Sequence, residues 1–383
     1  MCGILAFIRW KNNSSKNNDD IYFVDAMNRI EHRGPDSTFS THVQSNQFNA
    51  LLGFHRLAIV GNDSISNRLI TNKDKTLYLI CNGEIYNYTF LLQKYKLSPL
   101  SNSDCESILL LYQYYKTHHL PFSDLLLELD GVFSFVIVDT IDHSIFVGRD
   151  RIGVRPLYYS FNEDSIAFSS EGKSLLPFSF THPIQQFPPS TYSLLYSHSS
   201  LSFIKYYSIL NSKPILHGDL DFHSTHIRHL LTHAIQKRFQ SDRPIGFLLS
   251  GGLDSSLVAS IASKYLNSIT TFSIGIEGHQ SSPDLKYAKK VAQFIGSEHH
   301  EIILSLNDIE MALPEVIECL ETYDITTIRA SIPMYLLSKY IRNNTDIKVI
   351  FSGEGADELF GGYLYFHSAP TLNDFQSETL RLL

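Results

Sequence analysis

The sequence has few cysteines and no long hydrophobic segment. Its four cysteines are scattered over 383 residues, at positions 2, 81, 105 and 319, and none forms a C-x-x-C pair. This spacing excludes a disulfide framework, disfavours a structural zinc site and is typical of a reducing compartment. No apolar run approaches the roughly 20 residues that span a bilayer, and no basic region precedes the apolar start. We therefore expect a cytoplasmic protein with no membrane partner.

An excess of positive charge is also absent. Lysine and arginine total 31 against 39 aspartate and glutamate residues, so the formal net charge is −8. A nucleic-acid binder normally carries a basic patch, and none is visible here, so we expect no nucleic-acid partner. With 43% hydrophobic and 18% charged residues, the composition is that of a globular protein, and the length predicts two or three domains.

The two halves of the chain differ in pattern. Short β-branched and aromatic segments in the first half predict strands at 2–8, 50–60, 77–81, 131–139 and 144–148. The second half alternates, with helices predicted at 224–240, 255–266 and 284–295 around strands at 244–249 and 269–276. This alternation predicts a doubly wound parallel α/β sheet with right-handed crossovers. We place the domains at 2–195 and 215–383, and we expect the polar stretch 11–20 to be a surface loop or an insertion.

Cys2 directly follows the initiator methionine. If Met1 is removed, the chain begins with a thiol and a free amine on one residue. The amine has an ordinary pKa of roughly 7.7 to 8.0 and can accept the thiol proton near neutral pH. The alternative is that Cys2 is only a small buried residue of the first strand.

Three further features favour catalysis. His32–Asp36 is a polar turn, and Arg56 is a lone cation in an apolar segment, where its fork suits a carboxylate. Asn82 and Gly83 follow a predicted strand, and a side-chain amide beside a glycine N–H can form an oxyanion hole. Asp104 has two possible roles, which do not exclude each other. It can complement the dipole of a helix at 104–116, and it can receive a ligand ammonium. Ser103 and Glu106 fit a capping box for that helix.

The motifs MCGI, EHRGPDS, HRLAIV, CNGEIYN and SDCE together resemble the class II glutamine amidotransferases. The resemblance implies an α+β domain of the Ntn type, an α/β/β/α sandwich in which helices cover two antiparallel sheets. It implies that Cys2 attacks the side-chain amide of glutamine and releases ammonia. It also implies an oxyanion hole at Asn82 and Gly83. The implied glutamine-binding residues are Arg56, Leu57, Ala58, Ile59, Val60, Asn82, Gly83, Glu84 and Asp104.

A second site is predicted where the strand 244–249 meets a helix. The loop SGGLDSS at 250–256 offers glycines, hydroxyls and a helix N-terminus, which suit a phosphate group. It lacks the Walker lysine, which disfavours a P-loop kinase or GTPase. The segment SGEGADE at 352–358 carries three carboxylates, and it is either part of a Mg²⁺–nucleotide site or a solvated acidic turn.

The segments SPDLKYAKKVA, ETYDITTIRAS and SGEGADELFGGYLYFH sharpen the match to the glutamine-hydrolysing asparagine synthetase family, with a second domain of the PP-loop ATP pyrophosphatase type. The resemblance implies that glutamine, aspartate and ATP are substrates, that Glu354 takes part in forming β-aspartyl-AMP, and that ammonia travels inside the protein. The implied ATP-binding residues are Leu249, Ser250, Gly251, Gly252, Asp254, Ser255, Ile274, Ser352 and Gly353. Asp254 and Asp357 are the predicted Mg²⁺ ligands, and we also expect a homodimer.

The sequence departs from the family pattern in two ways, and alternative functions therefore stay open. Family members continue well past residue 383, so we expect a second domain without some covering helices and part of the aspartate site, and Ala356 stands where serine is common. A stand-alone glutaminase and a nucleotide-binding fragment are therefore alternatives, whereas the intact Cys2 set disfavours a β-lactam-type synthetase. His223, His226, His229 and His233 recur at helical spacing, and we expect a partly solvated helix face there rather than a zinc site.

Overall fold

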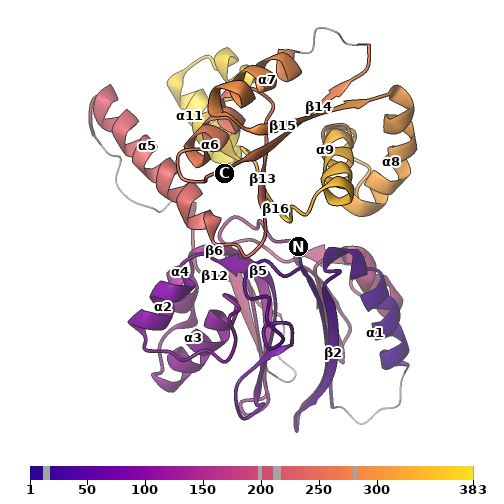
Figure 1. Cartoon of the computed structure of the whole chain (residues 1–383). Helices are drawn as coiled ribbons and strands as arrows, with labels where there is room; N and C mark the ends of the chain where they lie inside the picture. The colour runs from indigo at the N-terminus through magenta and orange to yellow at the C-terminus, as the bar shows by residue number, and fades with distance from the viewer. Residues whose placement is uncertain (12–17, 197–200, 210–216, 279–282, 383) are drawn as a thin grey trace. The chain divides into compact units, whose positions relative to one another are not determined.

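The computed structural model describes residues 1–11, 18–196, 201–209, 217–278 and 283–382 (Figure 1). The chain forms two compact units, Met1–Ser208 and Ile209–Leu383, which we describe separately. The division between them lies in the interval left open between the two predicted domains. Residues 12–17, most of the predicted polar loop, lie outside the described residues.

The first unit contains both sheets expected of a sandwich. Its elements are β1 (Gly3–Trp10), α1 (Asp19–Asn28), η1 (Glu31–Arg33), β2 (Ser37–Gln44), β3 (Phe48–Arg56), β4 (Ile70–Thr71), β5 (Leu77–Ile85), α2 (Tyr88–Lys94), α3 (Glu106–Thr117), α4 (Phe122–Glu128), β6 (Gly131–Asp139), β7 (Ser144–Arg149), β8 (Tyr158–Phe161), β9 (Ser165–Ser169), η2 (Gly172–Phe178), β10 (Gln185–Gln186), β11 (Thr191–Tyr196) and β12 (Ile204–Lys205).

These strands form two antiparallel six-stranded sheets, in the orders β10-β8-β9-β1-β3-β2 and β12-β11-β7-β6-β5-β4. Figure 1 shows α1 on one side of the sheets and α2, α3 and α4 on the other. Three hydrophobic cores fit this layering: one between the sheets and one under each helical layer. The predicted α/β/β/α sandwich is confirmed.

Strand β1 illustrates why the sequence adopts this arrangement. Successive side chains of a strand point to opposite faces. Ile4, Ala6 and Ile8 accordingly contribute to the core between the sheets, whereas Leu5 and Phe7 pack in the core beneath α1 and η2. A strand covered on both faces needs apolar residues at every position, which is why β1 reads as a continuous apolar run.

The second unit is built around parallel strands. Its elements are α5 (Leu220–Gln236), η4 (Lys237–Phe239), β13 (Ile245–Leu248), α6 (Leu253–Ala262), β14 (Thr270–Ile276), α7 (Pro283–Ile295), β15 (Glu298–Leu304), α8 (Leu306–Leu320), α9 (Ile325–Asn344), β16 (Val349–Phe351), α10 (Ala356–Phe360), η5 (Leu364–Ser368) and α11 (Leu372–Leu382).

The four strands pair in the order β15-β14-β13-β16, and every pair is parallel. Helices α6 and α7 cover one face through Ala259 and Ala288, and α9 covers the other through Leu337 and Ile341. The predicted doubly wound sheet is therefore confirmed. The chain moves outward from β13 to β15 and then returns to the opposite side of β13 with β16.

Several predicted boundaries were wrong. Strand β3 ends at Arg56 instead of continuing to residue 60, and β5 runs on to Ile85, so the Asn82–Gly83 pair lies within a strand. Helix α1 begins at Asp19, inside the stretch predicted to be a loop. The β5 extension is stabilised by pairing with β6, which outweighs the weak strand preference of asparagine and glycine.

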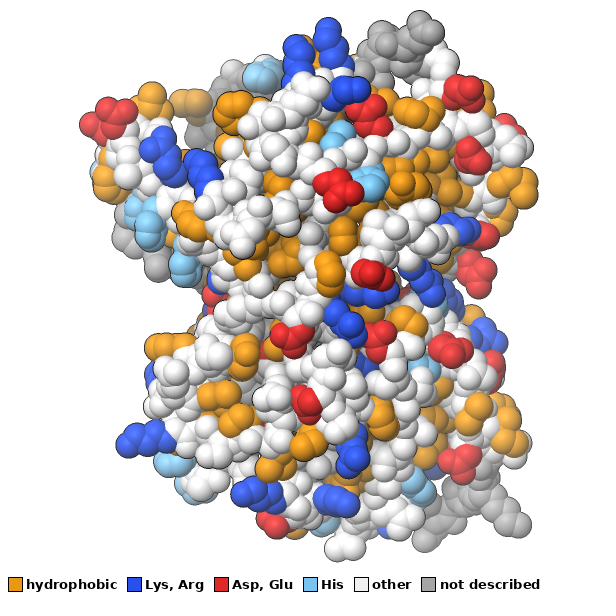
Figure 2. Space-filling model, in the orientation of Figure 1, with side chains coloured by type: hydrophobic (Ala, Val, Ile, Leu, Met, Phe, Trp, Pro, Cys, Tyr) orange, Lys and Arg blue, Asp and Glu red, His pale blue; other side chains and the backbone are white. Residues whose placement is uncertain are grey.

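In the part of the chain that the structure describes, no helix has the length and apolar character needed to cross a membrane. Positive and negative side chains are interspersed on the face shown in Figure 2. On α5, His226, His229 and His233 are exposed, and the described residues contain no group of three or more ligands that could hold a metal ion.

We predict that Phe146→Ala destabilises the first unit. Phe146 is fully buried, and its ring packs against those of Tyr112, Phe122 and Phe135. Loss of a buried phenylalanine costs about 3–5 kcal/mol. Hydrogen exchange of the β6 and β7 amides measures this unit alone, and Ile141→Ala, at a 64% exposed position, is the matched control. Equal exchange in both variants would contradict the packing described.

Candidate active sites

The first candidate site surrounds Cys2, the residue that precedes β1. The Cys2 thiol donates to the Leu57 carbonyl over 3.6 Å, and the Leu57 N–H donates to Cys2 Sγ over 3.4 Å. Burial raises the pKa of the Cys2 thiol, whereas the nearby N-terminal amine and the Leu57 N–H oppose this rise. The thiol is thus held by the main chain and needs a base to become a thiolate.

Arg56, the last residue of β3, is buried, and its partners are not carboxylates. Its guanidinium donates to Asn67 Oδ1, to the carbonyl of Val60 (2.9 Å) and to that of Gly61 (2.6 Å). Nε–H and one Nη1–H have no partner among the described residues. Arg56 therefore fixes the loop that follows it and keeps two donors available to a ligand.

The loop after Arg56 has a second anchor. The Ala58 N–H donates to Asp36 Oδ2 over 2.9 Å, which links the polar turn at 32–36 to this segment. Ala58 itself is buried, and Leu57, Ile59 and Val60 line the pocket beside Cys2.

Asn82 and Gly83 lie in β5 with donor groups near the pocket. The Nδ2 of Asn82 is buried and has no hydrogen-bond partner in the described structure. An unpaired buried donor is costly, so this amide is suited to an oxygen supplied by a ligand. Gly83 is required by packing, because a Cβ atom there would lie 2.6 Å from the Val132 carbonyl oxygen on β6.

The two acidic residues of the pocket differ in their partners. Glu84 Oε1 accepts from Arg155 Nη2 over 3.0 Å. Asp104 accepts from the Ile85 N–H over 2.7 Å. Burial raises the pKa of Asp104 to about 7, the nearby Glu84 charge adds to the rise, and hydrogen bonds oppose it. Asp104 has no cation beside it of the kind that Glu84 has, and a ligand ammonium would supply one.

The capping box predicted for this region was wrong. Asp104 and Cys105 precede α3, and Cys105 provides no side-chain cap. The Glu106 carboxylate instead accepts from the N–H groups of Leu100 and Ser101, both over 2.7 Å. Glu106 therefore organises the loop before the helix, and Asp104 points toward β5.

The pocket brings together most of the residues predicted for glutamine. Its cavity volume is about 30 Å³. Predicted residues on its wall are Cys2, Arg56, Leu57, Ile59, Val60, Gly83, Glu84 and Asp104; Ala58 and Asn82 are not on it.

The second candidate site lies where β13 ends. Ser250 Oγ and Ser255 Oγ are 3.0 Å apart, and the Gly252 N–H donates to Ser250 Oγ over 3.3 Å. Gly252 precedes α6 and has no side chain to bond the first N–H groups of the helix. These N–H groups and the positive end of the helix dipole favour an anion.

Gly251 fixes the shape of this loop. Its φ is +80°, and a Cβ atom there would lie 2.4 Å from the Ala288 backbone nitrogen on α7. Both the conformation and the close packing of α7 require glycine.

The segment 352–358, which comprises the loop after β16 and the start of α10, completes the site. A Cβ atom at Gly353 would lie 3.0 Å from Asp254 Cβ and from the Ser255 nitrogen, so the two loops touch. Strands β13 and β16 leave the sheet at the point where the strand order reverses, which is where open α/β sheets bind ligands.

The pocket between these loops has a volume of about 200 Å³. Predicted residues on its wall are Ser250, Gly252, Asp254, Ser255, Ser352, Gly353, Glu354 and Asp357. Leu249, Gly251 and Ile274 are not on this wall. Leu249 is buried, and its N–H donates to the Phe272 carbonyl over 2.8 Å, whereas Ile274 packs near Leu337 beneath α9.

Sequence reasoning missed three charged residues of the first unit: Arg155, Arg33 as a contact of Cys2, and Glu171. Arg33 Nε donates to the Cys2 carbonyl over 3.0 Å, and Arg33 Nη1 donates to Glu171 over 2.7 Å. The RDRIGVRP segment at 149–156 could have identified Arg155, because three cations there interrupt a buried strand and its turn.

Comparison with known proteins places both units in one family. A glutamine amidotransferase domain family matches residues 1–207, and the asparagine synthase family matches residues 226–382. The chain is 39% identical over 406 residues to a probable glutamine-hydrolysing asparagine synthetase of Acanthamoeba polyphaga mimivirus, matching 100% of this chain and 71% of that protein. It is 42% identical over 411 residues to the Mus musculus glutamine-hydrolysing asparagine synthetase, matching 100% of this chain and 70% of that protein.

Glutamine phosphoribosylpyrophosphate amidotransferase from B. subtilis superimposes with a TM-score of 0.45 and 14% identity, over 84% of this chain and 94% of that chain.

We predict that Gly251→Ala weakens nucleotide binding in the second pocket by at least about tenfold, because the added methyl group displaces α7 or distorts the loop. Gly278→Ala is the matched control, since Gly278 also has a positive φ, of +81°, but no atom lies within 4 Å of the place that its Cβ would take. Titration calorimetry with ATP compares the two. Equal losses would show that backbone conformation alone, and not the contact with α7, is responsible.

Proposed function

The chain belongs to the family of glutamine-hydrolysing asparagine synthetases, and on this premise we propose how its two pockets divide the family's reaction. The enzyme makes asparagine from aspartate, with glutamine as the nitrogen donor and ATP as the activating substrate. The observation that carries the proposal is that Cys2, Arg56 and Asp104, which come from three separate segments, line one pocket.

In the first pocket Cys2 is the nucleophile. Burial lowers the pKa of the Met1 α-amine to about 6. After removal of Met1, the α-amine of Cys2 becomes the N-terminal amine and can accept the thiol proton. The thiolate attacks the side-chain amide carbon of glutamine, ammonia leaves, and water hydrolyses the thioester to glutamate.

The remaining residues of this pocket hold glutamine and its transition state. The two available donors of Arg56 take the α-carboxylate, and Glu84 and Asp104 take the α-ammonium. Asn82 Nδ2 and the Gly83 N–H stabilise the oxyanion. The segment Leu57–Val60 forms the wall beside the thiol through Leu57, Ile59 and Val60, and Ala58 anchors it through its N–H bond to Asp36.

In the second pocket aspartate is activated by ATP. Its β-carboxylate attacks the α-phosphate, which releases pyrophosphate and forms β-aspartyl-AMP, and Glu354 assists this step. Ammonia from the first site then displaces AMP to give asparagine. Pyrophosphate is held by Ser250, Gly251, Gly252, Asp254 and Ser255, and the rest of ATP by Leu249, Ile274, Ser352 and Gly353.

We assign Mg²⁺ to the second pocket as well. Mg²⁺ typically uses one or two protein carboxylates and completes its coordination with substrate phosphates and water. Asp254 at the start of α6 and Asp357 at the start of α10 line the pocket, a donor set that matches this coordination. The bound ion would neutralise phosphate charge during the attack on ATP.

We make three further assignments, which concern the domain bounds, the cellular location and the oligomeric state. Residues 2–195 form the glutaminase domain, and residues 215–383 form the ATP- and aspartate-binding domain. A cytoplasmic location is supported by the four free cysteines. The homodimer stays a prediction.

We predict that Cys2→Ala loses glutamine-dependent asparagine synthesis by at least about a thousandfold, because no other group replaces the nucleophile. Synthesis with added ammonium should persist, since the second pocket is unchanged. The measurement is product analysis with aspartate, ATP, Mg²⁺ and either nitrogen donor.

The wild-type protein is the control. Asparagine and pyrophosphate from the wild type, with only ammonium-dependent synthesis in the variant, would support the two-site assignment. Glutamate without asparagine or pyrophosphate from the wild type would restrict this chain to glutamine hydrolysis.

We predict that glutamine binding weakens as the pH falls below 7. The pKa of Asp104 is raised to about 7, so this carboxyl loses its charge below that pH and no longer attracts the substrate ammonium. Affinity should fall by up to about tenfold per pH unit. Calorimetry on Cys2→Ala avoids turnover, and the double variant Cys2→Ala/Asp104→Asn should bind weakly with little pH dependence. The same pH dependence in both would assign the titration to another group.

A further inference from the structure

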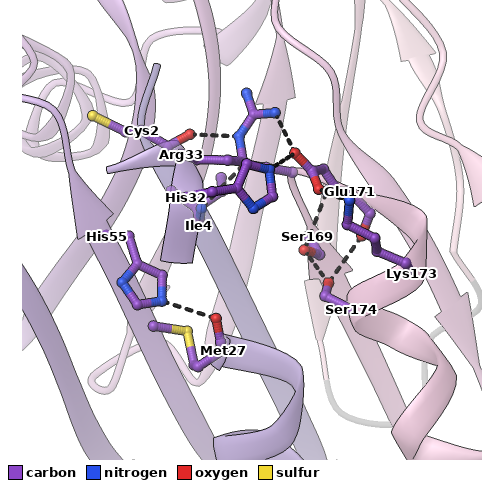
Figure 3. Close-up of polar contacts among 11 residues, drawn as sticks. Cys2, Ile4, Met27, His32, Arg33, His55, Ser169, Glu171, Lys173 and Ser174 are labelled. Atoms are coloured by element: carbon purple, nitrogen blue, oxygen red, sulfur yellow. Dashed lines mark hydrogen bonds and ion pairs between the residues drawn. The ribbon is translucent and has the colours of Figure 1, made fainter. Parts of the chain in front are cut away.

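A cluster of charges around a buried carboxylate lies beside Cys2 and has no role in the reaction as described so far. Glu171 follows the end of β9 and is 6% exposed. Its carboxylate contacts Arg33 Nη1 at 2.7 Å, His32 Nε2 at 3.0 Å and Lys173 Nζ at 3.0 Å. Figure 3 shows these side chains converging on the carboxylate. One buried anion therefore organises three basic side chains from two segments.

Arg33 connects this cluster to the nucleophile. While one arm of its guanidinium bonds Glu171, its Nε–H donates to the Cys2 carbonyl over 3.0 Å (Figure 3). The Arg33 side chain is only 9% exposed, so its orientation depends on these protein partners. A carboxylate that binds one side of a guanidinium fixes its orientation. In Arg33 this orientation points Nε–H at the Cys2 carbonyl.

Ser170, the residue before Glu171, holds Ile4, which lies two residues after Cys2. The Ile4 N–H donates to Ser170 Oγ and the Ser170 N–H donates to the Ile4 carbonyl, both over 3.0 Å. Residues 170 and 171 thus anchor the start of β1 at two adjacent points. Such anchoring matters because the first residues of a chain fray unless they are tied down, and Cys2 becomes the first residue after Met1 is removed.

We propose that Glu171 is a positioning residue for glutamine hydrolysis, acting through Arg33 to fix the main chain of Cys2 and hence the direction of its thiol and α-amine. This inference rests on the proposed role of Cys2 as the nucleophile. Glu171 does not touch the substrate. Its hydrogen bonds to His32 and Arg33 outweigh burial and lower its pKa to about 2, so it stays ionised throughout the working pH range.

The test compares Glu171→Gln with Lys173→Gln in glutamine hydrolysis by the full chain. Glutamine at 171 keeps the shape but removes the charge that holds Arg33. Lys173 forms an ion pair with the other carboxylate oxygen and is not among the groups that touch Cys2, so it is the matched control. For Glu171→Gln we expect kcat to fall about ten- to a hundredfold, the loss typical of a displaced catalytic group. KM should be nearly unchanged, because Arg56 and Asp104 remain in place, and Lys173→Gln should retain near wild-type kcat.

A second readout separates positioning from loss of folded protein. A glutamine analogue with a diazoketone in place of its side-chain amide labels Cys2 covalently and counts competent sites. The inference holds if the maximal labelling rate falls with kcat while half-saturation by the analogue is unchanged. The inference is overturned if the competent sites of Glu171→Gln react with the analogue and hydrolyse glutamine at wild-type rates. The ion pair would then contribute only to the stability of the fold. If Glu171→Gln does not fold, Glu171→Asp, which keeps the charge but shortens the reach, is measured in the same way.

Cys2→Ala keeps this test separate from the proposed function. Wild-type glutamine hydrolysis by Cys2→Ala would overturn the nucleophile assignment itself. An inactive Cys2→Ala together with a fully active Glu171→Gln would overturn the positioning role alone.

Discussion

The first site depends on the hydrogen-bond register of β1 with its two neighbours. Gly3 pairs with His55 on β3, and Leu5 pairs with Ser169 on β9. Because all three strands are antiparallel neighbours, the residues that follow His55 and Ser169 lie at the same end of the sheet as Cys2. One neighbour therefore delivers Arg56 and Leu57 to the thiol, and the other delivers Ser170 and Glu171 to the main chain. A slip of one residue would turn each of these side chains to the wrong face.

The second site depends on a different constraint, which is the closeness of two loops at the reversal of strand order. Strand β13 is paired with β14 on one side and with β16 on the other. Gly251 lets α7 approach the first loop, and Gly353 lets the second loop rest on the start of α6. A side chain at Gly251 would collide with α7, and a side chain at Gly353 would collide with Asp254 and Ser255. The glycines thus matter for packing between elements as well as for room around phosphate.

The sequence was most informative where chemistry is local. Cys2, the Asn82–Gly83 pair and the Ser250–Ser255 loop could be placed because each carries its donors within a few residues. The alternation of elements was enough to predict the parallel sheet of the second unit, whereas the sandwich of the first unit was predicted from the resemblance of its motifs to a known family. What the sequence could not reveal were partners distant in the chain: Arg155 lies 71 residues from Glu84, and Glu171 lies 138 residues from Arg33. The capping box failed because Glu106 has better-placed N–H donors in the preceding loop, a choice that depends on the loop's three-dimensional path.

Two buried acids of the first unit show how surroundings assign roles. Burial raises the pKa of Asp104 to about 7. The neighbours of this carboxyl are a backbone N–H and the like charge of Glu84. Burial acts on Glu171 in the same direction, but His32 and Arg33 overcome it and the pKa falls to about 2. Glu171 already has its cations and is complete without a ligand, as a positioning group should be. Asp104 lacks a cation, and the α-ammonium of glutamine is the group that would complete it.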